Sequence, residues 1–182
     1  MKSKKLIALI LTLTILCLGA VSMLKTLYPL KYEDYVEVYS KENNLSPAFV
    51  YAVIKCESDF DSNAVSSVGA TGLMQIMPDT FDWINMKLRE DNSYSMATDP
   101  ETNIKYGCYL YGYLLSKYGR VQEALAAYHA GLGNVDKWLS DERYSSDGET
   151  LHTIPFPTTN KYIKKVMLTE KIYENLYFRK EQ

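Results

Sequence analysis

The sequence has few of the residues that build metal and cofactor sites. Its 182 residues include only 2 histidines and 3 cysteines, and these do not stand at ligand spacings such as Cys-x-x-Cys or His-Glu-x-x-His. The Gly-Ala-Thr-Gly stretch at residues 69–72 is not followed by the Gly-Lys-Ser/Thr of a phosphate-binding loop. We therefore expect a protein that works without a metal ion or a cofactor.

Basic residues are too scattered to bind nucleic acid. Lysine and arginine number 20 against 22 acidic residues, and four of the lysines flank an apolar run near the N-terminus. The remaining 16 basic residues leave the rest of the chain with a formal charge of −6. A nucleic-acid interface needs a basic stripe, and the densest basic cluster is Lys161, Lys164 and Lys165. Nucleic acid is therefore excluded as a partner.

The three cysteines do not predict a disulfide framework. Cys56 and Cys108 each lie in an apolar helical pattern, where a free cysteine behaves as a small hydrophobe. A Cys56–Cys108 disulfide, which an exported protein can form, is the less favoured alternative. Cys17 is preceded by Leu16 where a lipoprotein signal needs a small residue, so we expect no lipid on it.

One long apolar run lies close to the N-terminus. Residues 6–24 carry no charged side chain, and at about 1.5 Å per residue they are long enough to cross a hydrocarbon core. The run exceeds the roughly 7–15 residues of a signal-peptide core, which favours an uncleaved anchor, and the lysines before it predict an extracytoplasmic body. We expect an anchor at residues 1–27 and one domain at residues 28–182. Secretion after cleavage near Ala20-Val21-Ser22 is the alternative.

The rest of the chain carries mostly helical patterns. Apolar residues recur at helical spacing, and Ser46-Pro47 and Asp99-Pro100 are typical helix starts. The Ser-, Gly- and Ala-rich residues 62–77 predict a loop with a short hairpin, and residues 140–158 predict a long loop. The fold class is therefore mainly α, of the lysozyme-like α+β kind, in a single helical domain. The predicted helices are residues 32–42, 46–57, 78–88, 99–118, 120–130, 135–139 and 160–177.

Glu57 ends an apolar stripe that contains Val50, Val53 and Ile54. An ordinary glutamic acid has a pKa near 4.3 and is mostly ionised at neutral pH. Burial disfavours the charged form and raises the pKa, so this carboxyl is placed to act as a general acid.

Three segments together resemble a known family. They are Glu57-Ser58, the run from Ser66 to Pro78 that ends in Gly-Leu-Met-Gln-Ile-Met-Pro, and Ala-Tyr-His-Ala-Gly at residues 127–131. In this order they resemble the catalytic domain of the Slt-type lytic transglycosylases, relatives of goose-type lysozyme that cleave peptidoglycan. The resemblance extends over roughly residues 32–178.

The resemblance implies a role for each matching residue. Glu57 would be the sole catalytic acid and base, and Ser66 would support the acetamido group of the substrate. The remaining implied site residues are Gln75 and Met77 in the groove, Tyr128 and His129 beside it, and Tyr162 on the last helix. The implied partners are peptidoglycan glycan strands and, through residues 1–27, the membrane; the sequence specifies no partner in an envelope assembly.

Two positions depart from the family pattern. His129 stands where the Ala-Tyr-x-Ala-Gly motif usually has Asn, and Thr158 stands where Glu-Thr-x-x-Tyr begins with Glu. Neither position is the acid itself. The resemblance therefore implies retained activity with altered contacts near the groove.

The number of carboxylates decides the expected reaction. A hydrolase of the usual kind needs a second carboxylate within about 5 to 9.5 Å. Asp59 lies about 200° round the helix from Glu57 and should point away, whereas Asp61 stays open as a partner. Without a second carboxylate, the substrate's own acetamido oxygen would attack, and the product would be a 1,6-anhydro sugar. A hydrolytic muramidase that uses Asp61 and a weakened peptidoglycan-binding module are the two alternatives.

Overall fold

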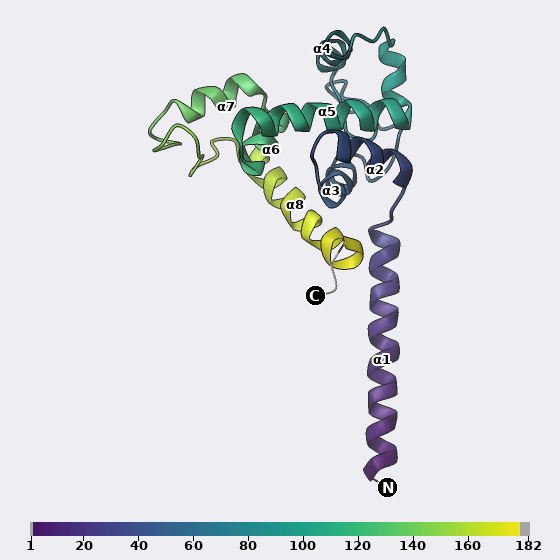
Figure 1. Cartoon of the computed structure of the whole chain (residues 1–182). Helices are drawn as coiled ribbons and strands as arrows, with labels where there is room; N and C mark the ends of the chain where they lie inside the picture. Colours follow the sequence, from purple (N-terminus) through teal and green to yellow (C-terminus); the bar gives the residue numbers. More distant parts are fainter. Residues whose placement is uncertain (1, 179–182) are drawn as a thin grey trace.

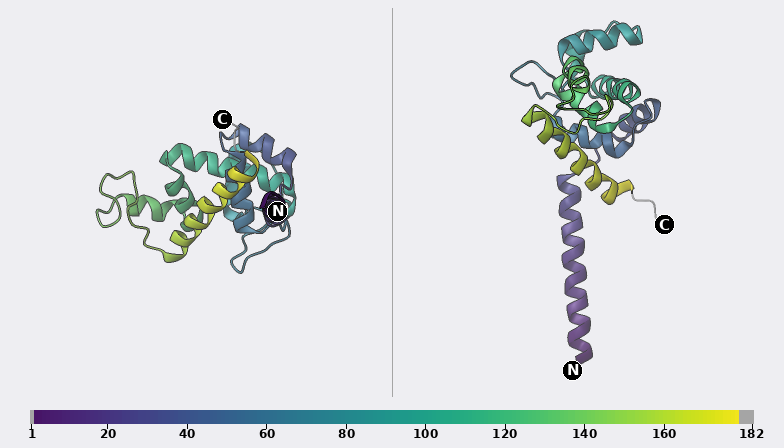
Figure 2. Two further views of the ribbon diagram at one scale, coloured as in Figure 1. Left: turned by 90° about the horizontal axis from the view of Figure 1, so that it is seen from below. Right: turned by 90° about the vertical axis from the view of Figure 1, so that its left-hand side faces the viewer.

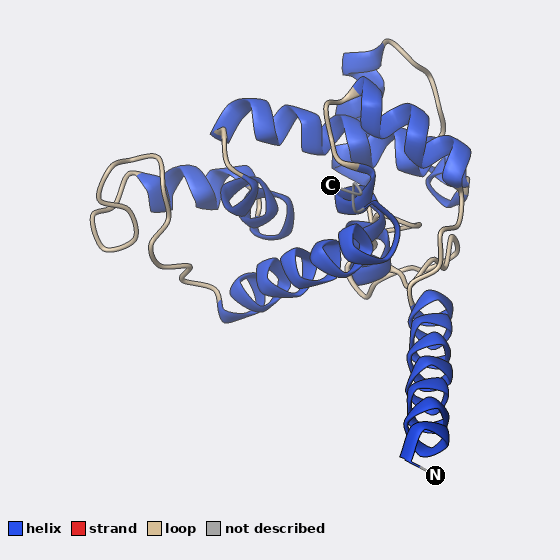
Figure 3. Ribbon diagram, turned by 60° about the horizontal axis from the view of Figure 1, so that its bottom comes forward, coloured by secondary structure: helices blue, strands red, loops and turns tan. Residues whose placement is uncertain are grey.

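The computed structural model describes residues 2–178, which form helices and loops (Figures 1 and 3). Within this range no strand is formed, and the mainly α prediction is confirmed. The elements are α1 (Lys2–Leu27), α2 (Glu33–Glu42), α3 (Pro47–Glu57), α4 (Pro78–Leu88), the 3₁₀ helix η1 (Tyr94–Thr98), α5 (Pro100–Tyr118), α6 (Val121–Ala130), α7 (Leu132–Leu139), α8 (Pro157–Tyr173) and the π-helical η2 (Glu174–Phe178).

The predicted helix starts are confirmed by their capping hydrogen bonds. The Ser46 hydroxyl accepts a hydrogen bond of 3.0 Å from the Phe49 amide, and the Asp99 carboxylate accepts one of 2.9 Å from the Thr102 amide. Such bonds satisfy amides that have no partner within the first helical turn. At the other end of α5, Gly119 has a φ of 70° and ends the helix after Tyr118, the predicted last residue.

Two predicted helix boundaries were wrong. Helix α7 begins at Leu132 instead of residue 135, because Gly131, with a φ of 87°, turns the chain so that the next helix starts at once. Helix α8 begins at Pro157 instead of residue 160, since proline fits the first helical position.

The predicted hairpin region is reduced to isolated bridges. Thr71 pairs with both Val65 and Ile76 in antiparallel bridges. The buried Asn103 of α5 fixes this loop, because its side chain accepts a hydrogen bond of 2.7 Å from the Met74 amide and donates one of 3.0 Å to the Thr71 carbonyl. The loop is thereby held against α5 at the end of α3.

The core is built around α3, which packs along α8 and is buried from Ala48 to Ile54. The chain runs from α5 through the shorter α6 and α7, and α8 then returns beneath the domain toward α1 (Figures 1 and 2). Cys56 and Cys108 are free thiols, so the disulfide alternative is not realised. Cys108 lies in the core, and the Cys56 sulfur is 3.6 Å from the Thr169 hydroxyl.

Helix α1 projects from the domain as a single rod (Figure 2). Its residues Lys4–Leu27 are long and apolar enough to cross a membrane, judged by length and composition alone. It ends at Leu27, the last residue of the predicted anchor. The two predicted domains also include residue 1 and residues 179–182, which lie outside the described residues.

Candidate active site

Glu57 is the last residue of α3 and lies where that helix meets α8. Burial raises the pKa of its carboxyl from 4.5 to about 7, against the opposing effects of a hydrogen bond with Tyr162 and the positive charge of Lys165. Desolvation prevails because the low-dielectric surroundings penalise the carboxylate more than one hydrogen bond and one cation stabilise it. A substantial fraction of Glu57 is therefore protonated at neutral pH.

A chain of tyrosines surrounds this acid. The Tyr162 hydroxyl, which hydrogen-bonds Glu57, lies 2.9 Å from the Tyr111 hydroxyl. The Tyr111 ring stacks on that of Tyr128 at 4.3 Å between centroids, and the Tyr128 hydroxyl donates to the Met74 carbonyl. Burial raises the pKa of all three phenols well above 10, so they remain neutral donors. Tyrosine side chains from α5, α6 and α8 therefore lie around the Glu57 carboxyl.

A groove of about 470 Å³ runs beside this cluster. Of the sequence-predicted residues, Met77, Tyr128 and His129 line it. Trp83 and Tyr113, whose ring centroids are 5.0 Å apart, supply aromatic surface to the groove. The other lining residues are Asp79, Thr80, Leu110, Leu114, Ala127, Gly131 and Leu132. Glu57 does not line this hollow, and Tyr128 connects it to the acid.

Ser66 and Gln75 shape the loop beside Glu57. The Ser66 hydroxyl accepts a hydrogen bond of 3.0 Å from the Ala70 amide. The Gln75 side chain, on a residue with a φ of 50°, donates to the carbonyls of Ala64 and Gly72 at 3.0 and 2.9 Å. These bonds leave the Ser66 hydrogen and the Gln75 carbonyl oxygen available for other contacts.

His129 joins the groove to α8. Its Nδ1 lies 3.0 Å from the hydroxyl of the buried Thr159, and its ring lies 4.7 Å from that of Tyr162. Burial lowers the pKa of this imidazole, so it is neutral at neutral pH. The departure from Asn thus places a ring against the tyrosine that contacts the acid.

The carboxylates near Glu57 in sequence have other partners. Asp59 pairs with Lys55 and its side chain is 74% exposed, so it points away as predicted. Asp61 accepts a hydrogen bond of 2.9 Å from the Asn63 amide in its own turn.

The sequence reasoning missed three features of the site. Tyr111 is one of them, because no local pattern separates it from its neighbours Tyr109 and Tyr113. Ser58 donates a hydrogen bond of 2.9 Å to the Leu73 carbonyl and ties the end of α3 to the loop; its place in the Glu57-Ser58 motif was the available signal. Asp79, in the first turn of α4, lines the groove.

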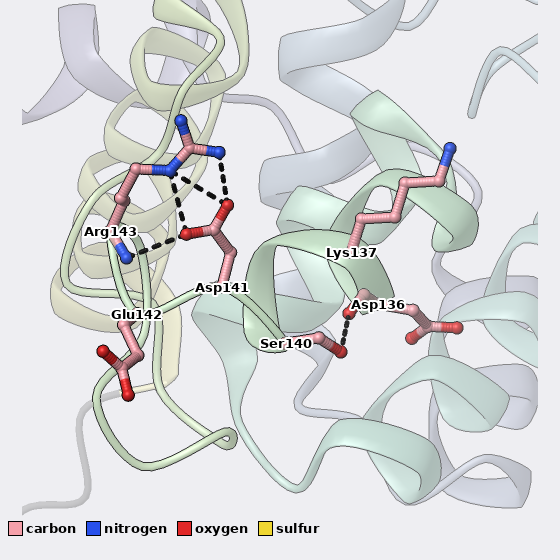
Figure 4. Close-up of a pocket in the computed structure, with 6 residues that line it drawn as sticks. All are labelled: Asp136, Lys137, Ser140, Asp141, Glu142 and Arg143. Atoms are coloured by element: carbon pink, nitrogen blue, oxygen red, sulfur yellow. Dashed lines mark hydrogen bonds and ion pairs between the residues drawn. The ribbon is translucent and has the colours of Figure 1, made fainter.

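A second hollow is unrelated to this cluster. Figure 4 shows charged side chains of α7 and the loop after it around an open space of about 820 Å³. Arg143 donates to both oxygens of Asp141, and Asp136 pairs with Lys117 of α5. In the described part of the chain, residues 2–178, no group of histidine, cysteine or acidic residues could hold a metal ion.

The mainly helical fold, with a desolvated glutamic acid at the end of a core helix beside a groove, is of the lysozyme-like class. A model of the transglycosylase SLT domain matches residues 34–150. The chain belongs to this family.

Named relatives and solved structures agree with this family. The chain is 33% identical over 159 residues to the soluble lytic murein transglycosylase of Salmonella typhimurium, covering 85% of this chain and 24% of the relative. It is 27% identical over 169 residues to the membrane-bound lytic murein transglycosylase C of Edwardsiella ictaluri, covering 80% of this chain and 47% of the relative. The structure of lytic transglycosylase Slt from Pseudomonas aeruginosa matches with a TM-score of 0.74 and 32% identity, over 84% of this chain and 25% of that one. The chain thus spans about a quarter of the length of the soluble relative.

Proposed function

We propose that the protein is a lytic transglycosylase that cleaves the β-1,4 bond between N-acetylmuramic acid and N-acetylglucosamine in peptidoglycan. The observation that carries the proposal is the position of Glu57. The Glu57 carboxyl is desolvated beside a groove, and its pKa of about 7 provides both protonated and ionised forms near neutral pH. Membership of the transglycosylase SLT domain family and the names of the relatives support the same activity.

In the first step, protonated Glu57 donates its proton to the glycosidic oxygen, and the bond from that oxygen to the muramic acid anomeric carbon breaks. The substrate's 2-acetamido oxygen attacks that carbon and takes up the positive charge. The Glu57 carboxylate formed in this step is stabilised by its hydrogen bond with Tyr162. The acid thus becomes a base at the same position.

In the second step, the Glu57 carboxylate removes the proton from the muramic acid 6-hydroxyl. The 6-oxygen attacks the anomeric carbon and displaces the acetamido oxygen, which closes a 1,6-anhydro ring. Glu57 is protonated again and no water is consumed. A single residue can perform both steps because its pKa lies near the working pH.

The other site residues hold the glycan in this scheme. Ser66 donates its free hydroxyl hydrogen to the acetamido group, and Gln75 and Met77 border the sugar next to the scissile bond. Tyr128 and His129 contact the glycan from the groove wall, and Tyr162 orients the acid. These roles follow from the motif positions, and the lining of the groove by Met77, Tyr128 and His129 supports them.

The enzyme acts outside the cytoplasm while α1 remains in the membrane. The length and composition of Lys4–Leu27 support an anchor, and the lysines before the apolar run support this orientation. In this arrangement α1 keeps the domain near its substrate.

Digestion of purified sacculi by the full chain and by Glu57→Gln tests the proposal. Release of soluble muropeptides by the full chain, abolished in Glu57→Gln, is the expected result. Glycan binding without release by the unaltered chain would instead identify a binding module and overturn the proposed activity.

A further inference from the structure

The five residues between α1 and α2, residues 28–32, are fixed to the domain. The Tyr28 carbonyl accepts a hydrogen bond of 2.8 Å from the Tyr177 hydroxyl, and the Pro29 carbonyl accepts one of 3.2 Å from the Tyr173 hydroxyl. The rings of Tyr28 and Tyr173 meet edge to face at 5.8 Å. We call residues 25–32 together with Tyr173 and Tyr177 the anchor joint.

The anchor joint is continuous with the core of the domain. Tyr173 is fully buried and stacks on Tyr51 of α3 at 5.3 Å between ring centroids. From outside, the Lys25 ammonium lies 5.3 Å from the Tyr177 ring and the Lys55 ammonium lies 5.5 Å from the Tyr28 ring. Cations held over aromatic faces add attraction to each contact. A linker fixed in this way leaves α1 little freedom to swing against the domain.

The position of the joint follows from the length of the apolar run. Residues 6–24 rise about 28 Å at 1.5 Å per residue, which matches a hydrocarbon core of about 30 Å. Lys25 and Tyr28 therefore emerge at the depth of the lipid headgroups, where tyrosine is enriched in membrane proteins. In Figures 1 and 2, the C-terminal end of α8 comes down to the level at which α1 meets the domain.

The surface beside the joint is aromatic and of mixed charge. Phe178 is 38% exposed and borders a shallow hollow with Leu30, Glu33 and Tyr51. The exposed Lys25 and Lys31 are balanced by acidic residues on neighbouring elements, namely Glu33, Asp34 and Glu174. This surface fits the headgroup layer of a phospholipid bilayer without a requirement for anionic lipid.

We infer that the anchor joint is a rigid seat that holds the domain against the phospholipid headgroups of the membrane that α1 enters, in one orientation. This rests on the proposed anchor and the proposed activity. A domain of this size has a radius of gyration of about 15 Å. The groove then reaches only glycan within roughly 40 Å of that membrane, and the substrate is the membrane-proximal layer of the wall.

Contact with the headgroups can be measured with a matched pair of tryptophan variants of the full chain, Phe178→Trp and Phe156→Trp. Both phenylalanines are exposed, at 38% and 44%, and they lie near opposite ends of α8. In nanodiscs whose lipids are brominated near the headgroup, we expect the Phe178→Trp chain to lose more tryptophan emission than the unaltered chain, which already contains Trp83 and Trp138, and the Phe156→Trp chain to lose no more than the unaltered chain. We expect the same result in phosphatidylcholine and in phosphatidylglycerol. Three results would overturn the proposed seat: equal quenching at both positions, quenching at position 178 in phosphatidylglycerol alone, or no quenching at position 178.

Rigidity can be measured by trypsin, which cuts after Lys25 and Lys31. Tyr177→Phe removes the hydrogen bonds to the carbonyls of Tyr28 and Lys25, whereas Tyr35→Phe removes a hydroxyl that makes no hydrogen bond with the described residues 2–178. In nanodiscs we expect the unaltered chain and Tyr35→Phe to resist cleavage equally, and Tyr177→Phe to be cut about two- to tenfold faster. A variant with ten Gly and Ser residues inserted after Leu27 provides the trypsin cleavage rate of a flexible linker. Cleavage of the unaltered chain at that rate would overturn the rigid joint.

Neither measurement depends on enzyme activity. If both give the expected result while sacculi stay intact, the proposed activity fails and the joint stands. If sacculi are cleaved while the tryptophan at position 178 is not quenched, the proposed activity is supported and the proposed contact with the headgroups is wrong.

Discussion

Helix α8 presents tyrosines at both of its ends, and the two ends serve different purposes. Near its start, Tyr162 contacts Glu57 and Tyr111. At its last residue, Tyr173 stacks on Tyr51 and donates to the Pro29 carbonyl. Both ends pack against the same core helix, α3.

The two clusters differ in the hydrogen-bond partner of their tyrosine hydroxyls. At the start of α8 the partner is a carboxyl whose pKa lies near 7, so the hydrogen bond changes in strength as the group ionises. At the end of α8 the partners are backbone carbonyls, which do not titrate. Loss of a hydroxyl should therefore change the pH dependence at one end and only stability at the other.

The largest effect expected is the loss of activity in Glu57→Gln. Glutamine cannot donate or accept the catalytic proton, and general acid–base catalysis contributes about 10²- to 10⁴-fold. We expect a loss of at least about 10³-fold in kcat, measured as muropeptide release, because this residue serves both steps. Retention of a tenth of the activity would show that another group donates the proton.

The next effect is expected for Tyr162→Phe. A hydrogen bond to a charged group is worth about 1.5–3 kcal/mol, so we expect kcat to fall by about 10- to 100-fold. Because this bond lowers the pKa of Glu57, its removal should move the alkaline limb of the pH–rate profile to higher pH. The matched control is Tyr111→Phe, which removes the hydroxyl that hydrogen-bonds Tyr162. This variant should show a smaller fall in kcat and a smaller shift of the alkaline limb. An unmoved alkaline limb in Tyr162→Phe would contradict the hydrogen bond to the acid.

The raised pKa of Glu57 also predicts a pH-dependent cost in stability. The folded state holds the proton more tightly than the unfolded chain, whose carboxyl titrates near 4.5, so the unfolding free energy falls as pH rises from about 4.5 to about 7. A glutamine side chain cannot ionise, and Glu57→Gln should be more stable by about 1 to 3 kcal/mol above pH 7. Below pH 4.5 this advantage should vanish. Denaturant unfolding of Glu57→Gln and of the unaltered chain, below pH 4.5 and above pH 7, measures this difference in unfolding free energy. The same difference at the two pH values would argue against a desolvated acid.

At the anchor end, Tyr173→Phe should cost about 1 kcal/mol of unfolding free energy, because one hydrogen bond to a carbonyl is lost while the ring contacts remain. We expect the pH–rate profile to stay unchanged in this variant. A shifted pH–rate profile would show that the two ends of α8 are coupled. It would contradict the claim that the hydroxyl at the end of α8 affects stability only.

The smallest effect is expected for Asp61→Asn. Asp61 caps its own turn by accepting from the Asn63 amide, and asparagine can accept in the same way. We expect less than a roughly twofold change in kcat. A loss comparable to that of Glu57→Gln would identify Asp61 as the second carboxylate of a hydrolase.

The sequence was most informative where local chemistry decides the structure. Ser46, Asp99 and Gly119 mark helix ends through capping bonds and a left-handed turn, and these act within one turn of the chain. Glu57 could be recognised because a carboxylate is unusual at the end of an apolar stripe. The boundaries near Gly131 and Pro157 were misjudged because apolar spacing is a weaker signal there than backbone conformation.

Contacts between distant segments could not be read from the sequence. Tyr111 is linked to Glu57 by hydrogen bonds through Tyr162, and Tyr177 contacts Tyr28, which lies 149 residues earlier in the chain. Both depend on the path of α8 along α3, which no local pattern specifies. Which of the sixteen tyrosines lie around Glu57, which lie at the anchor joint and which lie elsewhere becomes visible only in the folded structure.

The most direct test of the central claim is the mass of the muropeptides released from sacculi by the full chain. If Glu57 serves as both acid and base without a second carboxylate, the muramic acid ends carry the 1,6-anhydro ring, and Glu57→Gln releases none. Muramic acid ends with a free reducing group, heavier by one water, would contradict the account.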